Sequence, residues 1–152
     1  MKGVRLRRAR QADVPRLAEV ARAAYGRYVP RMGRPPRPMV ESYGAVVARH
    51  DVTVAVRDGA VVGLVVLVPD DAEGFLLDNV AVDPAHHGTG VGRALLEHAE
   101  HEARRAGFDS LYLFTHELMT ENQALYARIG YVEFDRRQHG DALLVYMRKQ
   151  LA

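Results

Sequence analysis

Hydrophobic residues recur along the chain with two periods, which change from one segment to the next. Residues 51–56 alternate between apolar and polar or small side chains, which predicts a strand with one covered face. Residues 60–68 are apolar at nearly every position and predict a strand buried on both faces in the middle of a sheet. Between residues 91 and 103, apolar side chains recur every four positions, so this segment is expected to form an amphipathic helix.

The same analysis of the whole chain predicts strands and helices without an internal repeat. Helices stand between strands only in the middle of the chain, which implies a mixed sheet with a meander before it and a hairpin after it. The predicted fold is α/β, with a mixed twisted sheet of about seven strands flanked by about four helices. Strands are expected over residues 4–8, 51–56, 60–68, 75–82, 110–115, 131–137 and 142–149, and helices over residues 13–25, 39–50, 91–106 and 118–129.

Glycine and proline mark the predicted turns. Asp58 and Gly59 are a hairpin signal, and residues 69–74, PDDAEG, are expected to form the next turn. Residues 28–38, YVPRMGRPPRP, are expected to form an irregular loop, because prolines prevent a helix from continuing. This loop is too short to link two domains. The sequence therefore predicts a single domain over residues 1–152, which is long enough to bury a full core.

Composition narrows the class of protein. Hydrophobic residues make up 48% of the chain and charged residues 26%, as is typical of folded soluble domains. Cysteine is missing from the sequence, which excludes disulfides, a thiolate nucleophile and cysteine-ligated metals. No apolar run approaches the roughly 18 residues that a membrane helix needs. We therefore expect no membrane partner, and a cytoplasmic location is the default expectation.

Charge gives little support for binding to nucleic acid. The formal net charge is +2, with 21 basic and 19 acidic residues. Arginines gather within residues 5–10 and 27–37, but aromatic residues suited to base stacking do not alternate with them. We expect no nucleic-acid partner. His86 and His87 are adjacent, without a carboxylate at ligand spacing, so no metal site is expected either.

Gly88, Gly90 and Gly92 stand between a predicted strand and a predicted helix. Backbone N–H groups without side chains around them, beside a helix N-terminus, favour an anion, and a phosphate or diphosphate is the usual ligand. A flexible turn is the alternative. The segment is not a P-loop, because Arg93 and Ala94 follow the last glycine where Lys and Ser or Thr are needed. Its glycine spacing also departs from the Rossmann fingerprint.

Two segments resemble the GCN5-related N-acetyltransferase (GNAT) family. Residues 77–100, LDNVAVDPAHHGTGVGRALLEHAE, resemble its acetyl-CoA site, whose pattern is Arg/Gln-x-x-Gly-x-Gly/Ala. His87 stands in the Arg/Gln position, which is a departure from that pattern. Residues 121–134, ENQALYARIGYVEF, resemble a later element of the family, in which a helical Tyr is followed four residues on by Gly and an aromatic residue, here Tyr126, Gly130 and Tyr131.

The resemblance implies a GNAT-like fold that binds acetyl-CoA and transfers its acetyl group to a primary amine. Backbone amides and the central strand are the family's means of holding the cofactor, and a backbone N–H of that strand serves the oxyanion. Asn122 lies one turn before Tyr126 and either contacts the cofactor or caps local backbone. The positions that match the family's cofactor site are Val80, Ala81, Val82, His87, Gly88, Thr89, Gly90, Val91, Gly92, Arg93, Asn122 and Tyr126.

Tyr126 is the candidate general acid, because the resemblance places the family's proton donor to the CoA thiolate there. A phenol with a pKa of about 10 is protonated at neutral pH and can supply that proton. Helical spacing predicts that Leu118, Leu125 and Ile129 form the buried stripe, with Tyr126 near its edge. Asp78 is the candidate general base. A water chain serving as the base, or a solvated or supporting role for Asp78, remains open.

The acceptor pocket is expected around residues 25–43 and the last hairpin. Tyr25, Tyr28, Met32 and Arg34 are the candidate contacts there, with His116 beside the cofactor cleft. The amine that accepts the acetyl group could be a small molecule or a peptide, and the acyl-chain preference is also open. A homodimer formed through the edge strands is a further possibility. A non-catalytic acyl-CoA-binding sensor or interaction module is the alternative to an enzyme.

Overall fold

The computed structural model describes residues 3–152, apart from the side chains of Asp70 and Asp71. Within that range, seven strands form one sheet in the order β1-β2-β3-β4-β5-β7-β6. The β1–β2, β2–β3, β5–β7 and β6–β7 pairs are antiparallel, whereas β4 and β5 are parallel. The predicted mixed sheet is therefore confirmed. Its strands are β1 (Arg5–Arg8), β2 (Asp51–Arg57), β3 (Ala60–Asp71), β4 (Gly74–Val82), β5 (Ser110–His116), β6 (Val132–His139) and β7 (Ala142–Gln150).

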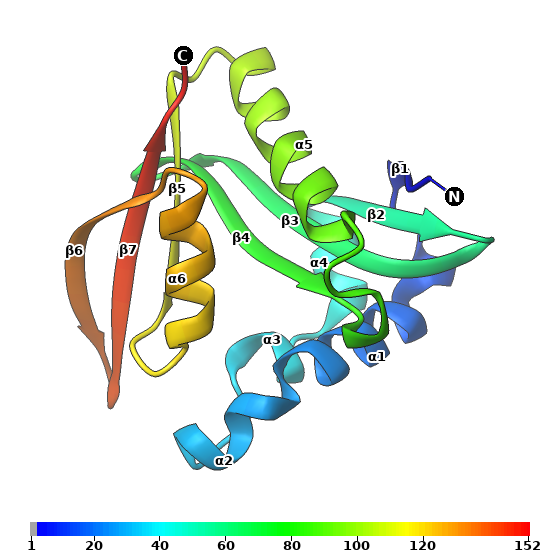
Figure 1. Cartoon of the computed structure of the whole chain (residues 1–152), viewed down its shortest axis with the longest axis horizontal. Helices are drawn as coiled ribbons and strands as arrows, with labels where there is room; N and C mark the ends of the chain where they lie inside the picture. Colours follow the sequence, from blue (N-terminus) through cyan, green and yellow to red (C-terminus); the bar gives the residue numbers. More distant parts are fainter. Residues whose placement is uncertain (1–2) are drawn as a thin grey trace. The chain divides into compact units, whose positions relative to one another are not determined.

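Helices connect and cover these strands, and Figure 1 labels them along the chain. Four of the α-helices in the described range have seven residues or more, in agreement with the predicted number. The helices are α1 (Val14–Tyr25), α2 (Val29–Met32), α3 (Arg37–Val40), α4 (Tyr43–Arg49), α5 (Val91–Arg105) and α6 (Thr120–Arg128), with 3-10 turns η1 (Gln11–Asp13), η2 (Gly26–Tyr28) and η3 (Pro84–His86).

The chain divides into two compact units. Unit 1 comprises Met1–Leu67 and Asn79–Ala99, and unit 2 comprises Val68–Asp78 and Glu100–Ala152. Strand β4 passes from unit 2 into unit 1 between Asp78 and Asn79. The sequence-based expectation of a single domain stays a prediction.

Unit 1 is built around β2 and β3. Residues Val61–Leu67 of β3 are all buried, which confirms the prediction of a strand covered on both faces. Helix α1 lies on one face and the first half of α5 on the other (Figure 1). A Cβ at Gly63 would lie 3.0 Å from side-chain atoms of both Val91 and Leu95. The missing side chain at Gly63 therefore allows α5 to lie close against β3.

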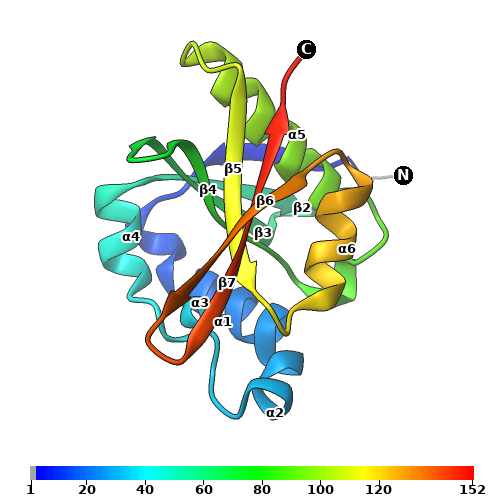
Figure 2. The same cartoon turned by 90° about the vertical axis from the view of Figure 1, so that its left-hand side faces the viewer.

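Unit 2 contains the β6–β7 hairpin, paired through β7 with β5 (Figure 2). Tyr112 and Tyr146 are buried in a cluster with Leu76. Arginine side chains cover their rings, since the Arg137 guanidinium carbon lies 4.2 Å from the Tyr146 ring centroid and that of Arg148 lies 5.3 Å from the Tyr112 centroid. Cation–π contacts of this kind stabilise a sheet face that carries aromatic residues.

Several predicted boundaries were wrong. The expected loop over residues 28–38 contains α2 and the start of α3, because Pro30 and Pro38 stand in the first turns of these helices, where the missing N–H is not needed. The helix expected over residues 39–50 is interrupted at Glu41, which is extended. Strand β3 continues to Asp71, into the expected turn.

The predicted buried face of the last helix was also wrong. Tyr126 is only 6% exposed, whereas Leu125 is 38% exposed. Leu118 precedes α6, which begins at Thr120. Because α6 has nine residues, its few apolar positions define no clear stripe, and the packing around it decides which face is buried.

Candidate active site

The loop between β4 and α5 keeps its backbone exposed. Asp83 begins the loop, and its carboxylate accepts a hydrogen bond from the N–H of Ala85 at 3.0 Å. Gly88 and Gly90 have φ values of +74° and +91°, and a Cβ at either would meet nothing within 4 Å. Positive φ is the reason that glycine is favoured at these positions. The open space leaves the adjoining N–H groups accessible to an anion at the start of α5.

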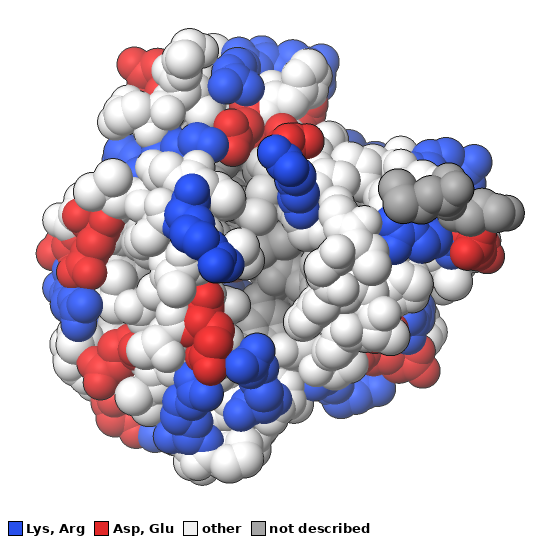
Figure 3. Space-filling model, viewed as in Figure 1, with Lys and Arg blue, Asp and Glu red and all other residues white. Residues whose placement is uncertain are grey.

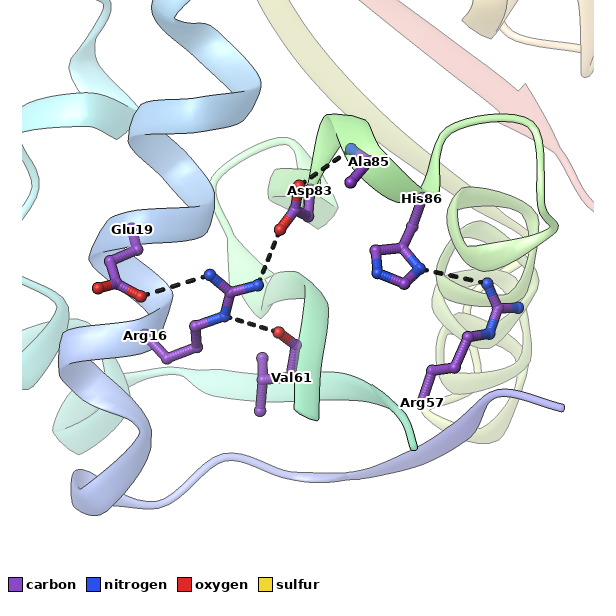
Figure 4. A network of polar contacts seen from close by, with 7 residues as sticks. All are labelled: Arg16, Glu19, Arg57, Val61, Asp83, Ala85 and His86. Carbon is purple, nitrogen blue, oxygen red and sulfur yellow. Dashed lines mark hydrogen bonds and ion pairs between the residues drawn. The ribbon is translucent and has the colours of Figure 1, made fainter. Parts of the chain in front are cut away.

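Two arginines from other elements hold this loop (Figure 4). Arg16 of α1 donates to the Asp83 carboxylate at 2.8 Å and to the carbonyl of Val61 at 2.8 Å. The hydrogen bond from the N–H of Ala85, partly opposed by burial and supported by Arg16, keeps the pKa of Asp83 below its usual value. Arg57, the last residue of β2, donates to the side-chain oxygen of Thr89 at 2.7 Å and to its carbonyl at 3.1 Å.

Unit 1 brings together most of the predicted cofactor residues. Val80, Ala81 and Val82 end β4, and Gly92 lies close enough to Val82 for a Cβ to be 3.6 Å from its methyl. His87, Thr89 and Arg93 are exposed, and Val91 is buried. Asn122 and Tyr126 lie on α6 of unit 2, so their part in a cofactor site stays a prediction.

A buried polar network beside β4 was missed by the sequence analysis. The Tyr25 hydroxyl lies 2.7 Å from Oδ1 of Asn79 and 3.0 Å from the carbonyl of Val80. The Asn79 amide donates to the Tyr43 hydroxyl at 3.1 Å, and Tyr43 donates to the carbonyl of Pro38 at 2.6 Å. These contacts fix the end of β4 against α1, α3 and α4. The available signal in the sequence was an asparagine among the apolar residues that end β4.

Other predicted acceptor contacts lie in the same unit. Tyr28 is 2% exposed, and the guanidinium groups of Arg27 and Arg31 lie 5.5 and 5.2 Å from its ring centroid. Met32 is half-buried at the end of α2, and Arg34 is exposed. Their contact with an acceptor stays a prediction.

The candidate general acid, Tyr126, packs against a second tyrosine in unit 2. Its ring centroid lies 5.8 Å from that of Tyr131, with the ring planes at 63°. The carbonyl of Tyr126 accepts the backbone N–H of Tyr131 at 3.0 Å, after Gly130 reverses the chain with φ of +107°. Burial raises the pKa of Tyr131, whose hydroxyl is buried with no hydrogen-bond partner among the described residues.

The remaining candidates are Asp78 and His116. Asp78 is half-buried on β4, at the end of the segment that belongs to unit 2. His116 ends β5, and its Nδ1 accepts the N–H of Leu118 at 3.1 Å. Because Nδ1 accepts this hydrogen bond from the turn before α6, Nε2 is the ring nitrogen that could contact a ligand.

No group of three or more potential metal ligands occurs among the residues that the structure describes. None of the described helices is long and apolar enough to cross a membrane.

Comparison with known proteins assigns the family. The model of the acetyltransferase (GNAT) domain matches residues 48–133, more than half of the chain. The protein therefore belongs to the GNAT family, as its two motifs predict, and the prediction of a GNAT-like fold is confirmed.

Individual relatives share a minority of identical residues with this chain. The chain is 37% identical over 103 residues to the IAA acetyltransferase of Azospirillum brasilense, covering 64% of this chain and 66% of that one. It is 37% identical over 73 residues to the ribosomal protein bS18 alanine N-acetyltransferase of Escherichia coli K12, covering 48% and 47%. The chain thus spans under two thirds of either relative. The PaiA N-acetyltransferase of Thermoplasma acidophilum, solved with coenzyme A, has a TM-score of 0.79 at 19% identity, covering 97% and 99%.

Proposed function

We propose that the protein is an N-acetyltransferase that transfers an acetyl group from acetyl-CoA to a primary amine by direct attack. The observation that carries this proposal is the exposed backbone at Gly88 and Gly90, with positive φ and open space around it, directly before α5. Such a loop fits a diphosphate. Membership of the GNAT family supports the identity of the cofactor.

In the proposed mechanism, acetyl-CoA supplies an activated acyl group and a thiolate leaving group. The amides of the loop over residues 88–92 bind the diphosphate. The end of β4 offers backbone groups to the pantetheine arm and an N–H to the oxyanion. Tyr25 and Asn79 stabilise this end of the strand, because the Tyr25 hydroxyl shares its proton between Oδ1 of Asn79 and the carbonyl of Val80. We propose direct transfer because the sequence contains no cysteine, so no thiol is present to form an acyl-enzyme.

Tyr126 is proposed to donate its hydroxyl proton to the departing sulfur. In Tyr126→Phe the ring and its packing are kept, so CoA should bind within about twofold of the wild type, whereas kcat should fall about 10²-fold to 10⁴-fold. Release of free thiol measures kcat, and calorimetry measures binding. Tyr131→Phe is the matched control, because the hydroxyl of Tyr131 is buried and unpaired; its kcat should be unchanged. Equal kcat values for the two variants would remove Tyr126 from the mechanism.

Asp78 is proposed to take the proton from the attacking amine. Asp78→Asn should then lower kcat about 10²-fold or more. A loss of under about threefold would favour a water chain as the base.

The alternative is a CoA-binding sensor or interaction module without catalysis. Acetyl-CoA incubated with a panel of amines separates the two, because only the enzyme releases free thiol. The panel should include small primary amines and peptides with a free N-terminal alanine, since one relative is named for acetylating an alanine. If CoA binds but none of the amines in the panel causes release of free thiol, the result would favour the non-catalytic module.

A further inference from the structure

Arg57 lies far from the glycine loop in sequence but contacts it directly. It ends β2, 32 residues before Thr89. One terminal nitrogen of its guanidinium donates to the Thr89 side-chain oxygen at 2.7 Å, and the other donates to the Thr89 carbonyl at 3.1 Å. The same group lies 3.5 Å from Nδ1 of His86 (Figure 4). A single side chain therefore contacts the loop at two residues that flank Gly88.

The hydrogen bonds have a fixed direction. A guanidinium only donates, so the Thr89 hydroxyl must accept from Arg57. That hydroxyl then gives its own proton to the carbonyl of His86 at 2.5 Å. The chain Arg57 to Thr89 to His86 closes the loop across Gly88. It uses the threonine hydroxyl proton internally, so Thr89 has no proton left for a phosphate.

Arg16 and the N–H of Ala85 hold the start of the loop at Asp83, whereas the glycines that follow have few neighbours. Gly88 and Gly90 have no atom within 4 Å of the position that a Cβ would occupy, and glycine residues gain the most conformational freedom when they are not restrained. His87 occupies the position at which the family resemblance expects Arg or Gln, and its side chain is exposed. Arg57 belongs to β2, and its hydrogen bonds to Thr89 restrain this segment of the loop.

We propose that Arg57 is a positioning residue for cofactor binding, which acts through Thr89 to hold the glycine loop in its binding conformation before CoA arrives. The inference deepens the proposed function, since it concerns the proposed diphosphate site. A preformed loop loses less conformational entropy on binding, so its advantage should appear as affinity for CoA. The chemistry after binding should change little, because Arg57 contacts Thr89 and His86, and neither of these is the proposed acid or base.

The first test needs no cofactor. Hydrogen exchange of the backbone amides of Ala85, His86 and His87, whose N–H groups are hydrogen-bonded within the loop, is compared between wild type, Arg57→Met, Thr89→Val and Thr89→Ser. Loss of the restraint should speed exchange about tenfold in Arg57→Met and in Thr89→Val, whereas serine keeps the hydroxyl and should restore protection. Arg5→Met is the matched control. Arg5 is exposed on β1 and pairs in register with Val56, so this variant loses the same charge beside the same strand. Equal exchange in Arg57→Met and Arg5→Met would overturn the inference.

The second test is a double-mutant cycle on the dissociation constant of CoA and on the KM for acetyl-CoA. Arg57→Met and Thr89→Val should each raise both constants about tenfold, while kcat at saturation stays within about twofold. Because the two residues act as a unit, the double variant should lose no more than either single variant. Additive losses would show that Arg57 binds the diphosphate itself and would overturn the positioning role. If the wild-type protein fails to bind CoA, the proposed function is overturned, and so is the role of Arg57 in cofactor binding. The hydrogen-exchange experiment would still decide whether Arg57 orders the loop.

Discussion

Two buried tyrosines show that the contribution of a hydroxyl group to stability depends on whether it has a hydrogen-bond partner. Tyr131 is 2% exposed, and its hydroxyl has no partner among the described residues. Tyr25 is 7% exposed, and its hydroxyl makes hydrogen bonds to Asn79 and Val80. A buried polar group without a partner lowers stability, whereas a satisfied one contributes to it.

Removal of these hydroxyls should therefore have opposite effects on stability. Tyr131→Phe should raise the free energy of unfolding by about 1 kcal/mol, and Tyr25→Phe should lower it by about 1–3 kcal/mol. Urea denaturation of the two variants beside the wild type measures both. Similar destabilisation by the two substitutions would mean that the Tyr131 hydroxyl is satisfied.

Asp13 links the start of α1 to β1 through Arg7. Its carboxylate accepts two hydrogen bonds from the Arg7 guanidinium, at 2.9 and 3.0 Å, and one from the N–H of Arg10 at 2.8 Å. The hydrogen bonds from Arg7, partly opposed by burial, lower the pKa of Asp13. A carboxylate whose pKa is lower in the folded state stabilises the fold above its unfolded pKa, and this contribution disappears as the pH falls through the folded pKa.

Asp13→Asn should reduce the free energy of unfolding by about 1.5–3 kcal/mol at pH 7. The difference from wild type should shrink as the pH falls below about 4, where the carboxyl group of the unfolded chain takes up a proton, and it should disappear below the lower pKa of the folded state. Denaturation at several pH values measures this. Asp135→Asn is the control, since Asp135 pairs with Arg137 on the surface and its side chain is 44% exposed, so this ion pair should contribute little to stability. A constant difference for Asp13→Asn across the pH range would contradict the assignment.

At the scale of elements, glycine decides how closely a helix approaches a strand. A Cβ at Gly63 of β3 would lie 3.0 Å from Val91 and Leu95 of α5 and 3.1 Å from the carbonyl of Ala81. Gly44 in α4 has only one neighbour within 4 Å of that position, the Gln11 side chain at 3.6 Å. The first site has no room for a methyl group, and the second has.

Gly63→Ala should lower the free energy of unfolding by about 1–3 kcal/mol, because α5 must move outward. Gly44→Ala should raise it by about 0.4–1 kcal/mol, since alanine has less freedom in the unfolded chain. Thermal unfolding of both variants gives the comparison. Gly63→Ala should also weaken CoA binding, because the loop over residues 88–92 is continuous with α5. Unchanged CoA affinity would separate the position of α5 from the cofactor site.

At the scale of the whole molecule, basic and acidic residues are nearly balanced, at 21 and 19, with a formal net charge of +2. On the face that Figure 3 draws, Lys and Arg side chains stand among Asp and Glu side chains. We therefore expect recognition of CoA to depend on the local loop more than on a broad basic surface.

Binding of CoA should stabilise the whole chain by linkage. At a CoA concentration of about 100 times its dissociation constant, the free energy of unfolding should rise by about 2.7 kcal/mol. For a chain of this length the melting temperature should then rise by about 5–10 °C. Scanning fluorimetry against CoA concentration measures the shift, with adenosine as the control that lacks a diphosphate. An equal shift with adenosine would place the affinity outside the glycine loop.

Local patterns predicted most of the strands and the long helix. Strand β3 is apolar at nearly every position, and helix α5 has an apolar residue at every fourth position, so each pattern is long enough to favour one type of element. The short elements were predicted less well. Helices α2 and α3 have four residues each, too few for a period, and prolines in a first turn look the same in sequence as prolines in a loop.

The candidate site divides in the same way. The sequence by itself determined the glycine loop, the helix behind it and the two family motifs, because each depends on residues a few positions apart. Only the tertiary structure decided that Arg57 holds Thr89, that Tyr25 and Tyr43 hold Asn79, and that Tyr126 and not Leu125 is buried. Those contacts join segments up to 54 residues apart or depend on the neighbours of a short helix. Packing selects among the faces and partners that local propensity leaves equivalent.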